Sequence, residues 1–150
     1  MVKAVKPMTR RLRKYIDHDR IRAAVEAAER ATSGEIVVAV SPWFWGNVER
    51  VAKRAFDRLG VGRTRGHTGV LIFVCPRRRQ ATVLGDAAIH AKAGQALWDG
   101  AVAAIRDAAK AGDLTAGVVR AIELVGAELA AKFPHGDKAS NELPDEPIAG

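Results

Sequence analysis

The sequence of 150 residues has one cysteine, few aromatic residues and no long apolar run. The single cysteine, Cys75, excludes an internal disulfide and a cysteine-rich zinc site. Its apolar setting, VLIFVC, predicts a small buried side chain rather than a nucleophile. No apolar run approaches the roughly 20 residues that span a bilayer, and residues 1–14 lack the apolar core of a secretory signal. We therefore expect a cytoplasmic protein, either in solution or peripheral to a membrane.

Sequence motifs of several enzyme classes are also missing. There is no phosphate-binding GxxxxGK[ST], no dinucleotide-binding GxGxxG, no GxSxG nucleophile elbow and no zinc-binding HExxH. None of the four histidines lies four residues from another or close to the cysteine, so we expect no metal site built on paired histidines. A content of 48% hydrophobic and 27% charged residues is typical of one compact domain that folds without disulfides or metal.

The net charge of +7 is concentrated in two segments. Residues 1–14 carry six basic and no acidic side chains, and residues 50–79 carry nine basic side chains against Asp57 alone. Such segments suit nucleic acid, anionic lipid or an acidic partner, and a solvated surface is the simplest interpretation. Because no RNA-binding or helix-turn-helix pattern accompanies them, we do not expect a nucleic-acid partner.

Apolar periodicity predicts an α/β fold. The predicted elements are helix 17–32, strand 35–41, helix 47–59, strand 69–75, strand 80–84, a short helix near 87–93, helix 95–111 and helix 113–132. The first two strands are unbroken apolar runs, which is typical of strands buried on both faces, and the helix between them indicates a right-handed parallel crossover. The four-residue link 76–79 suits a hairpin, so the third strand should run antiparallel. The prediction is a small mixed sheet sandwiched by helices.

Three parts of the chain differ in composition. Residues 1–16 form a basic arm, residues 17–133 the α/β domain, and residues 134–150 a tail rich in proline and acids, for which we predict no regular structure.

The ends of the first helix can be predicted from single residues. Asp17 or Asp19 can cap its N-terminal end, and Gly34 is placed to end it in a left-handed conformation.

The end of the predicted sheet where the parallel strands start is acidic. The topology brings together there Glu35, His67, Thr68 and Asp86. Asp86 and Glu35 are candidate ligands of a hard cation, Ca²⁺ or Mg²⁺. The alternatives are a turn carboxylate that bonds nearby backbone for Asp86, and a salt bridge or solvation for Glu35.

The opposite end of the predicted sheet is basic and aromatic. A candidate anion site there consists of Arg77, Arg78, Arg79 and Asn47, because arginine forks and a helix N-terminus suit phosphate. The alternative for the arginines is a charged hairpin tip that keeps the turn soluble. A candidate interaction surface consists of Trp43, Phe44 and Trp45, whose alternative is partial burial over the end of the sheet.

Several segments in order carry a family resemblance. They are residues 29–38 (ERATSGEIVV), 56–60 (FDRLG), 67–74 (HTGVLIFV), 85–86 (GD), 98–99 (WD) and 141–145 (NELPD). Over residues 15–147 the chain resembles the TPM domain family, and specifically its short bacterial members without a membrane segment.

The resemblance implies a mixed-sheet α/β sandwich. It also implies acid phosphatase activity and photosystem repair as known roles of plant members, divalent-ion binding in some members, and membrane proteins of the LemA type as companions of bacterial members. Longer members carry a GxGLE-like stretch where residues 85–90 here read GDAAIH, so His90 replaces a glutamate. The loop after the first strand also has no acids. Asp86 is the one acid that carries over as a candidate ligand.

Two functional hypotheses result. The first is a non-catalytic interaction domain that serves a membrane-associated or envelope assembly, with a protein partner of the LemA type and with residues 1–14 contacting anionic lipid. The alternative is a phosphatase-like hydrolase that depends on a divalent metal. The sequence identifies no catalytic residue for it.

Overall fold

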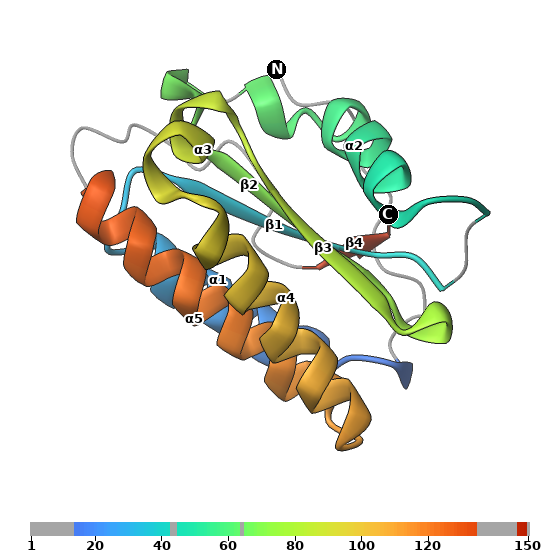
Figure 1. Ribbon diagram of the computed structural model, residues 1–150. Coiled ribbons are helices and arrows are strands. Elements are labelled where there is room, and N and C mark those ends of the chain that lie inside the picture. The colour runs from blue at the N-terminus through green and yellow to red at the C-terminus, as the bar shows by residue number, and fades with distance from the viewer. Residues whose placement is uncertain (1–13, 43–44, 64, 135–146, 150) are drawn as a thin grey trace.

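A computed structural model of the chain describes residues 14–42, 45–63, 65–134 and 147–149. These residues contain five α-helices and four strands (Figure 1). The helices are α1 (His18–Glu29), α2 (Val48–Arg58), α3 (Ala87–Ala93), α4 (Gln95–Lys110) and α5 (Leu114–Lys132). The strands are β1 (Glu35–Val40), β2 (Gly69–Cys75), β3 (Gln80–Gly85) and β4 (Ile148–Ala149). Among these residues, no helix is both long and apolar enough to cross a membrane.

The strands form one mixed sheet in the order β3-β2-β1-β4. β1 and β2 are parallel, with Glu35 opposite Gly69 and Val40 opposite Val74. β3 runs antiparallel to β2, with Val70 opposite Gly85. The parallel crossover through α2 and the hairpin at residues 76–79 are both confirmed.

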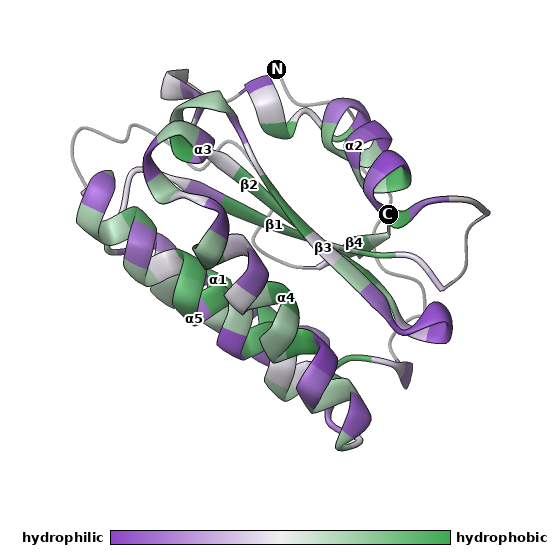
Figure 2. Ribbon diagram, in the orientation of Figure 1, coloured by the Kyte–Doolittle hydropathy of each residue, from purple (hydrophilic) through white to green (hydrophobic). Residues whose placement is uncertain are grey.

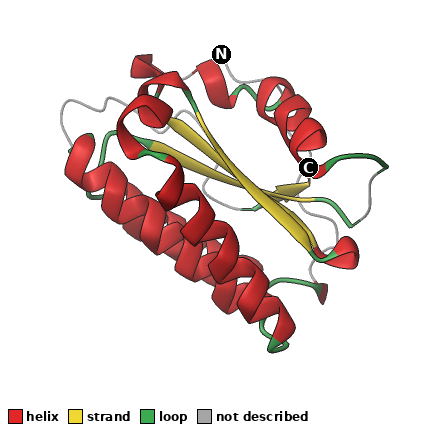
Figure 3. Ribbon diagram, in the orientation of Figure 1, coloured by secondary structure: helices red, strands yellow, loops and turns green. Residues whose placement is uncertain are grey.

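Helices cover the two faces of the sheet unequally. Helices α1, α4 and α5 pack on one face, and α2 with the turn Val61–Arg63 packs on the other (Figures 1 and 3). Successive β1 residues alternate between the layers, so Ile36 and Val38 join the three-helix core while Val37 and Ala39 join the α2 core. Burial from both sides is why β1 and β2 are apolar along their length, as the colouring of Figure 2 shows.

The N-terminal ends of the helices are close to their predicted positions. Asp17 caps α1 by accepting hydrogen bonds from the backbone N–H groups of Asp19 and Arg20, at 3.1 and 3.2 Å. The C-terminal end of α1 differs from the prediction, because the helix stops at Arg30 in a right-handed conformation. Gly34 serves close packing instead: a Cβ there would lie 3.1 Å from a methyl group of Leu129. The prediction of a left-handed end at Gly34 is therefore wrong.

The tail also differs from the prediction. Residues 148–149 form β4, which pairs in parallel with Ala39 and Val40 of β1. Ile148 is 2% exposed and belongs to the α2 core. Two residues carry no periodic signal, and their partner strand lies more than a hundred residues earlier in the chain. The expectation of a tail without any regular structure is therefore wrong at these residues.

Candidate functional site

Asp86 lies at the end of the sheet where the parallel strands start, which we call the amino end, and it forms hydrogen bonds to several neighbouring segments there. Its backbone N–H donates to the carbonyl of Gly69 at 2.9 Å, and it is the N-cap residue of α3. Its Oδ1 accepts from the Ala87 N–H at 2.8 Å, and its Oδ2 lies 3.1 Å from His67 Nδ1. Both carboxylate oxygens thus have partners in the chain, as expected of a carboxylate that fixes a turn.

Glu35 lies at the same end but on a different strand. It is 2% exposed and pairs across the ladder with Gly69, which separates it from Asp86. The two backbones are therefore about 10 Å apart, because each strand spacing is about 5 Å. Within residues 14–42, 45–63, 65–134 and 147–149, no three His, Cys, Asp or Glu side chains are grouped as a metal would need. The geometry does not bring the two candidate ligands together.

Glu29 is a buried acid at this end that the sequence analysis did not single out. It is 7% exposed, and its Oε2 accepts the Ile36 N–H at 2.8 Å. The carboxylate therefore fixes the start of β1 from the end of α1. A signal was available, since Ile21, Val25 and Glu29 are spaced four residues apart on the buried stripe of α1.

Thr32 connects β1 to the far end of the chain's longest helix. It is fully buried, and its hydroxyl lies within hydrogen-bond distance of the carbonyls of Leu129 and Phe133. It also accepts the Gly34 N–H at 3.0 Å. These contacts close the C-terminal end of α5 against the entry to the sheet.

The carboxyl end of the sheet presents arginine and tryptophan to solvent. Arg77 and Arg79 are exposed on the hairpin tip, where Arg79 adopts φ 53°. Arg78 Nη1 donates to the Gly46 carbonyl at 2.7 Å and thereby joins the tip to the loop before α2. Trp45 on that loop is 86% exposed. We call these four residues, Trp45 and Arg77 to Arg79, the arginine–tryptophan patch; Trp43 and Phe44 lie outside the described residues.

Asn47 has a structural role in the first turn of α2. Its Oδ1 accepts the N–H groups of Glu49 and Arg50, at 2.9 and 3.1 Å. These donors of the helix N-terminus are therefore engaged within the chain. The exposed Arg77 and Arg79 keep the guanidinium chemistry that can bind an anion in the way predicted.

Cys75 is buried beneath the patch. It is 0% exposed, and its Sγ lies 3.5 Å from the carbonyl of Pro42. Burial raises the pKa of the Cys75 thiol above its ordinary value of 9.0, and the neighbouring Arg78 and Arg77 oppose this effect only in part. The side chain is placed as a small core residue, as the sequence predicts.

Comparison with known proteins gives a matching family model and related solved structures. The family model of the TPM domain matches residues 15–128. The NMR structure of the BA42 protein from the psychrophilic bacterium Bizionia argentinensis is 32% identical, with a TM-score of 0.81 over 89% of this chain and 92% of that one. The N-terminal domain of the cg2496 protein from Corynebacterium glutamicum is 19% identical, with a TM-score of 0.58 over 100% and 95% of the two chains, and shares the fold. No curated protein matches.

Proposed function

The chain belongs to the TPM domain family, and from this premise we propose that it is a non-catalytic interaction domain that serves a membrane-associated assembly at an anionic lipid surface. The observation that carries the proposal is the arginine–tryptophan patch. Its tryptophan is the one large apolar side chain exposed among the described residues, and it lies on a loop that Arg78 ties to the hairpin tip.

The chemistry of the patch suits a lipid headgroup region. A tryptophan ring is favourable at the boundary between headgroups and acyl chains. Each arginine near an anionic surface contributes on the order of 1 kcal/mol, and its fork can hold a phosphate with two hydrogen bonds. Residues 1–14 add six basic side chains to the same chain, which strengthens the attraction to anionic lipid.

Two features support a role without catalysis. The hydrogen bonds of Asp86 use both of its oxygens for the cap and for His67. The other candidate ligand, Glu35, lies two strands away. These placements favour a structural role for the acidic end. We therefore place the contact with lipid at the opposite end of the sheet. The protein partner that we propose belongs to the same membrane-associated assembly.

Co-sedimentation with vesicles tests this proposal. The variants are Trp45→Ala with Arg77→Ala, and a full-length chain with glutamine at the six basic positions of residues 1–14. The control is Arg120→Ala, which removes one exposed charge from α5 on the three-helix side. Vesicles of phosphatidylcholine with and without phosphatidylglycerol are compared at low and high salt.

We expect the wild type to bind only the anionic vesicles, and less at high salt. The double variant should lose about tenfold or more in affinity, since two contacts of on the order of 1 kcal/mol are removed. The Arg120 variant should bind like the wild type. Equal, salt-insensitive sedimentation of all variants would remove the membrane part of the proposal.

A further inference from the structure

The outer edge of β3 lies at the bottom of a groove of about 560 Å³. The floor is the strand itself, from Thr82 to Gly85. One wall comes from α2, with Lys53 and Phe56, and the other from α3 and α4, with His90 and Trp98. Figure 1 looks onto this edge, with β3 in front between α2 and α4. We call this feature the β3 groove.

The register fixes which backbone groups point into the groove. The Asp86 N–H donates to the Gly69 carbonyl, so residues 86 and 69 form a hydrogen-bonded pair. Hydrogen-bonded and non-hydrogen-bonded pairs alternate along antiparallel strands. Ala81, Val83 and Gly85 therefore direct their N–H and C=O groups away from β2. The Val74 carbonyl, opposite Ala81, faces away from β3 and accepts the Ser41 N–H at 2.9 Å, which agrees with this phase.

Trp98 of α4 lines the same groove. The residue is 4% exposed, and its indole Nε1 is buried with no hydrogen-bond partner among the described residues. A buried donor left without an acceptor destabilises the folded state. The ring lies against the strand, because a Cβ on Gly85 would approach its Cζ2 and Cη2 atoms to 2.8 Å.

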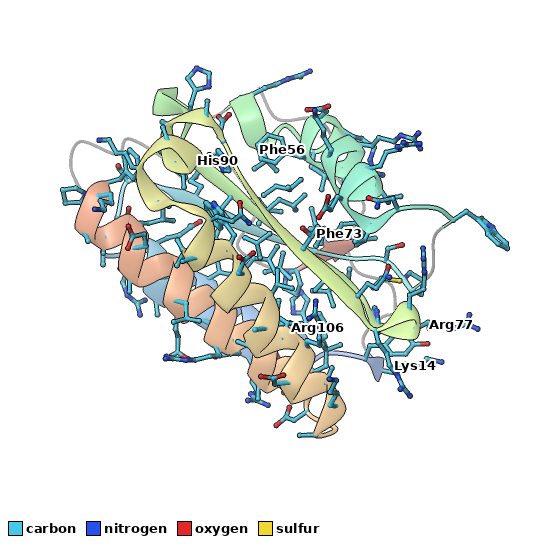
Figure 4. All side chains as sticks on the ribbon, in the orientation of Figure 1. Lys14, Phe56, Phe73, Arg77, His90 and Arg106 are labelled. Carbon is cyan, nitrogen blue, oxygen red and sulfur yellow. The ribbon has the colours of Figure 1, made fainter. Side chains whose placement is uncertain are left out.

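A second, smaller hollow of about 30 Å³ lies beside the hairpin end of β3. Ala81 and Gln80 line it together with Arg79 and Arg106, the latter on α4 (Figure 4). Neither arginine forms an ion pair with any other residue that the structure describes. This hollow therefore carries two guanidinium groups that suit carboxylates, whereas the α2 wall of the β3 groove carries the acids Glu49 and Asp57.

We propose that the β3 groove binds an extended segment of a partner protein, which adds to the sheet as a fifth strand antiparallel to β3 and carries acidic residues at its carboxyl end. Addition of a peptide strand to an open sheet edge is a common recognition mode, in which the main chain supplies affinity. In the antiparallel direction the segment's carboxyl end lies beside Arg79 and Arg106. Its backbone would satisfy the outward groups of Val83 and Gly85.

The shape of the groove favours a single strand over a second copy of the domain. The floor is recessed between two helical walls, so the β3 edges of two copies cannot approach to the roughly 4.8 Å spacing of paired strands. The molecule already completes its other sheet edge with an isolated short segment, since β4 pairs with β1. An extended segment with acidic side chains at its carboxyl end is the occupant that suits the groove.

The test uses fluorescently labelled peptides and the full chain. The probe peptide has the sequence STVTVEDE, and its charge-reversed control has the sequence STVTVKKK. Two further probes carry N-methyl groups on alternate residues, in one phase or the other, because only one phase removes donors that face β3. Binding is measured by anisotropy and by amide and indole ¹H–¹⁵N shifts.

We expect the acidic probe to bind at least about tenfold more tightly than the basic one. Shifts should centre on the Val83 and Gly85 amides and the Trp98 indole, and only one N-methylated probe should retain binding. Arg106→Glu should weaken the acidic probe by about tenfold, and Trp98→Phe, which replaces the indole by a smaller phenyl ring and so changes the groove wall, should weaken both probes. Arg120→Glu is the matched charge control.

Equal affinity for both peptides, retention of binding by both N-methylated probes, or shifts confined to other residues would overturn the proposal. A larger mass of the free protein at rising concentration, with loss of peptide binding, would indicate a second copy in the groove and would also overturn it. The vesicle test is independent, because Arg106 lies outside the arginine–tryptophan patch. Arg106→Glu with normal vesicle binding and weakened peptide binding separates the two proposals.

Discussion

The two ends of the sheet use polar side chains in different ways. At the amino end, Thr32, Glu29 and Asp86 are largely buried and hydrogen-bonded to backbone groups of neighbouring elements. At the carboxyl end, Arg77 and Arg79 extend into solvent from a hairpin tip. The first set connects strands to helices, whereas the second is presented to the surroundings.

This difference indicates where substitutions affect stability and where they affect binding. A buried polar group that loses its partner leaves another group unsatisfied, which costs about 1–3 kcal/mol. An exposed charge on a turn contributes little to folding. The amino end should therefore be sensitive in unfolding experiments, and the carboxyl end should be sensitive only in binding experiments.

Gly69→Ala should have the largest effect on stability. A Cβ at this position would lie 2.3 Å from the carbonyl oxygen of Val61, and backbone cannot move away as a side chain can. We expect the free energy of unfolding in urea to fall by about 3 kcal/mol. Gly100→Ala is the control, since nothing lies within 4 Å of its Cβ and α4 should gain up to about 1 kcal/mol. A Gly69 variant as stable as the wild type would contradict the expectation that the amino end of the sheet is sensitive in unfolding experiments.

Thr32→Val should come next. The substitution keeps the shape but removes the hydroxyl that bonds the Leu129 carbonyl and the Gly34 N–H. We expect a loss of about 2 kcal/mol in the free energy of unfolding. Thr32→Ser keeps the hydroxyl and should retain more stability than the valine variant. The opposite ranking would mean that packing of the methyl group outweighs the hydrogen bonds.

Asp86→Ala should destabilise the protein by about 1 kcal/mol, because it removes the N-cap of α3. Asp86→Asn keeps a capping oxygen and should lose less. Thermal unfolding of both variants, followed by circular dichroism, measures the difference. If the two variants are destabilised equally, the charge beside His67 matters more than the cap.

Cys75 gives a pH-dependent effect at the carboxyl end. Its raised pKa means that the folded state keeps the proton after the unfolded state has lost it. The contribution of the protonated thiol to the free energy of unfolding is therefore complete below about pH 9 and is lost as the pH rises further. At pH 9.5 the loss should be less than about 1 kcal/mol. Cys75→Ala should show a shallower fall of unfolding free energy between pH 8 and 10 than the wild type. Parallel curves for the two proteins would contradict the assignment.

Arg77→Ala should have the smallest effect on stability, within about 0.5 kcal/mol. Its side chain is exposed on the hairpin tip. Urea unfolding of this variant checks the value, with Arg120→Ala as the exposed control on α5. A fall of more than about 1 kcal/mol in the free energy of unfolding would show that the tip contributes to folding, and it would contradict the difference between the two ends.

Much of the fold could be predicted because its signals are local. The apolar runs of β1 and β2, the caps at Asp17 and Asn47, and the hairpin link all depend on neighbouring residues. The topology then places Glu35 and Asp86 at one end and the arginines at the other. It could not give their distance across the sheet or the hydrogen bonds that engage Asp86.

The features that escaped prediction depend on how separate elements pack against one another. Nothing near Glu29 indicates that the Ile36 N–H is its partner. The β3 groove needs α2 and α4 on either side of an edge strand, and a hairpin pattern does not tell which of its edges stays open. The same holds for β4, whose partner is β1.

The pairing of β4 with β1 also determines when one edge of β1 can be covered during synthesis of the chain. Ile148 and Ala149 leave the ribosome more than a hundred residues after Ala39 and Val40, their partners in the sheet. At about 5–20 residues per second, β1 waits for several seconds with that edge unpaired. During this interval the nascent domain exposes a strand edge that the finished domain covers, and such an open edge can pair with another chain.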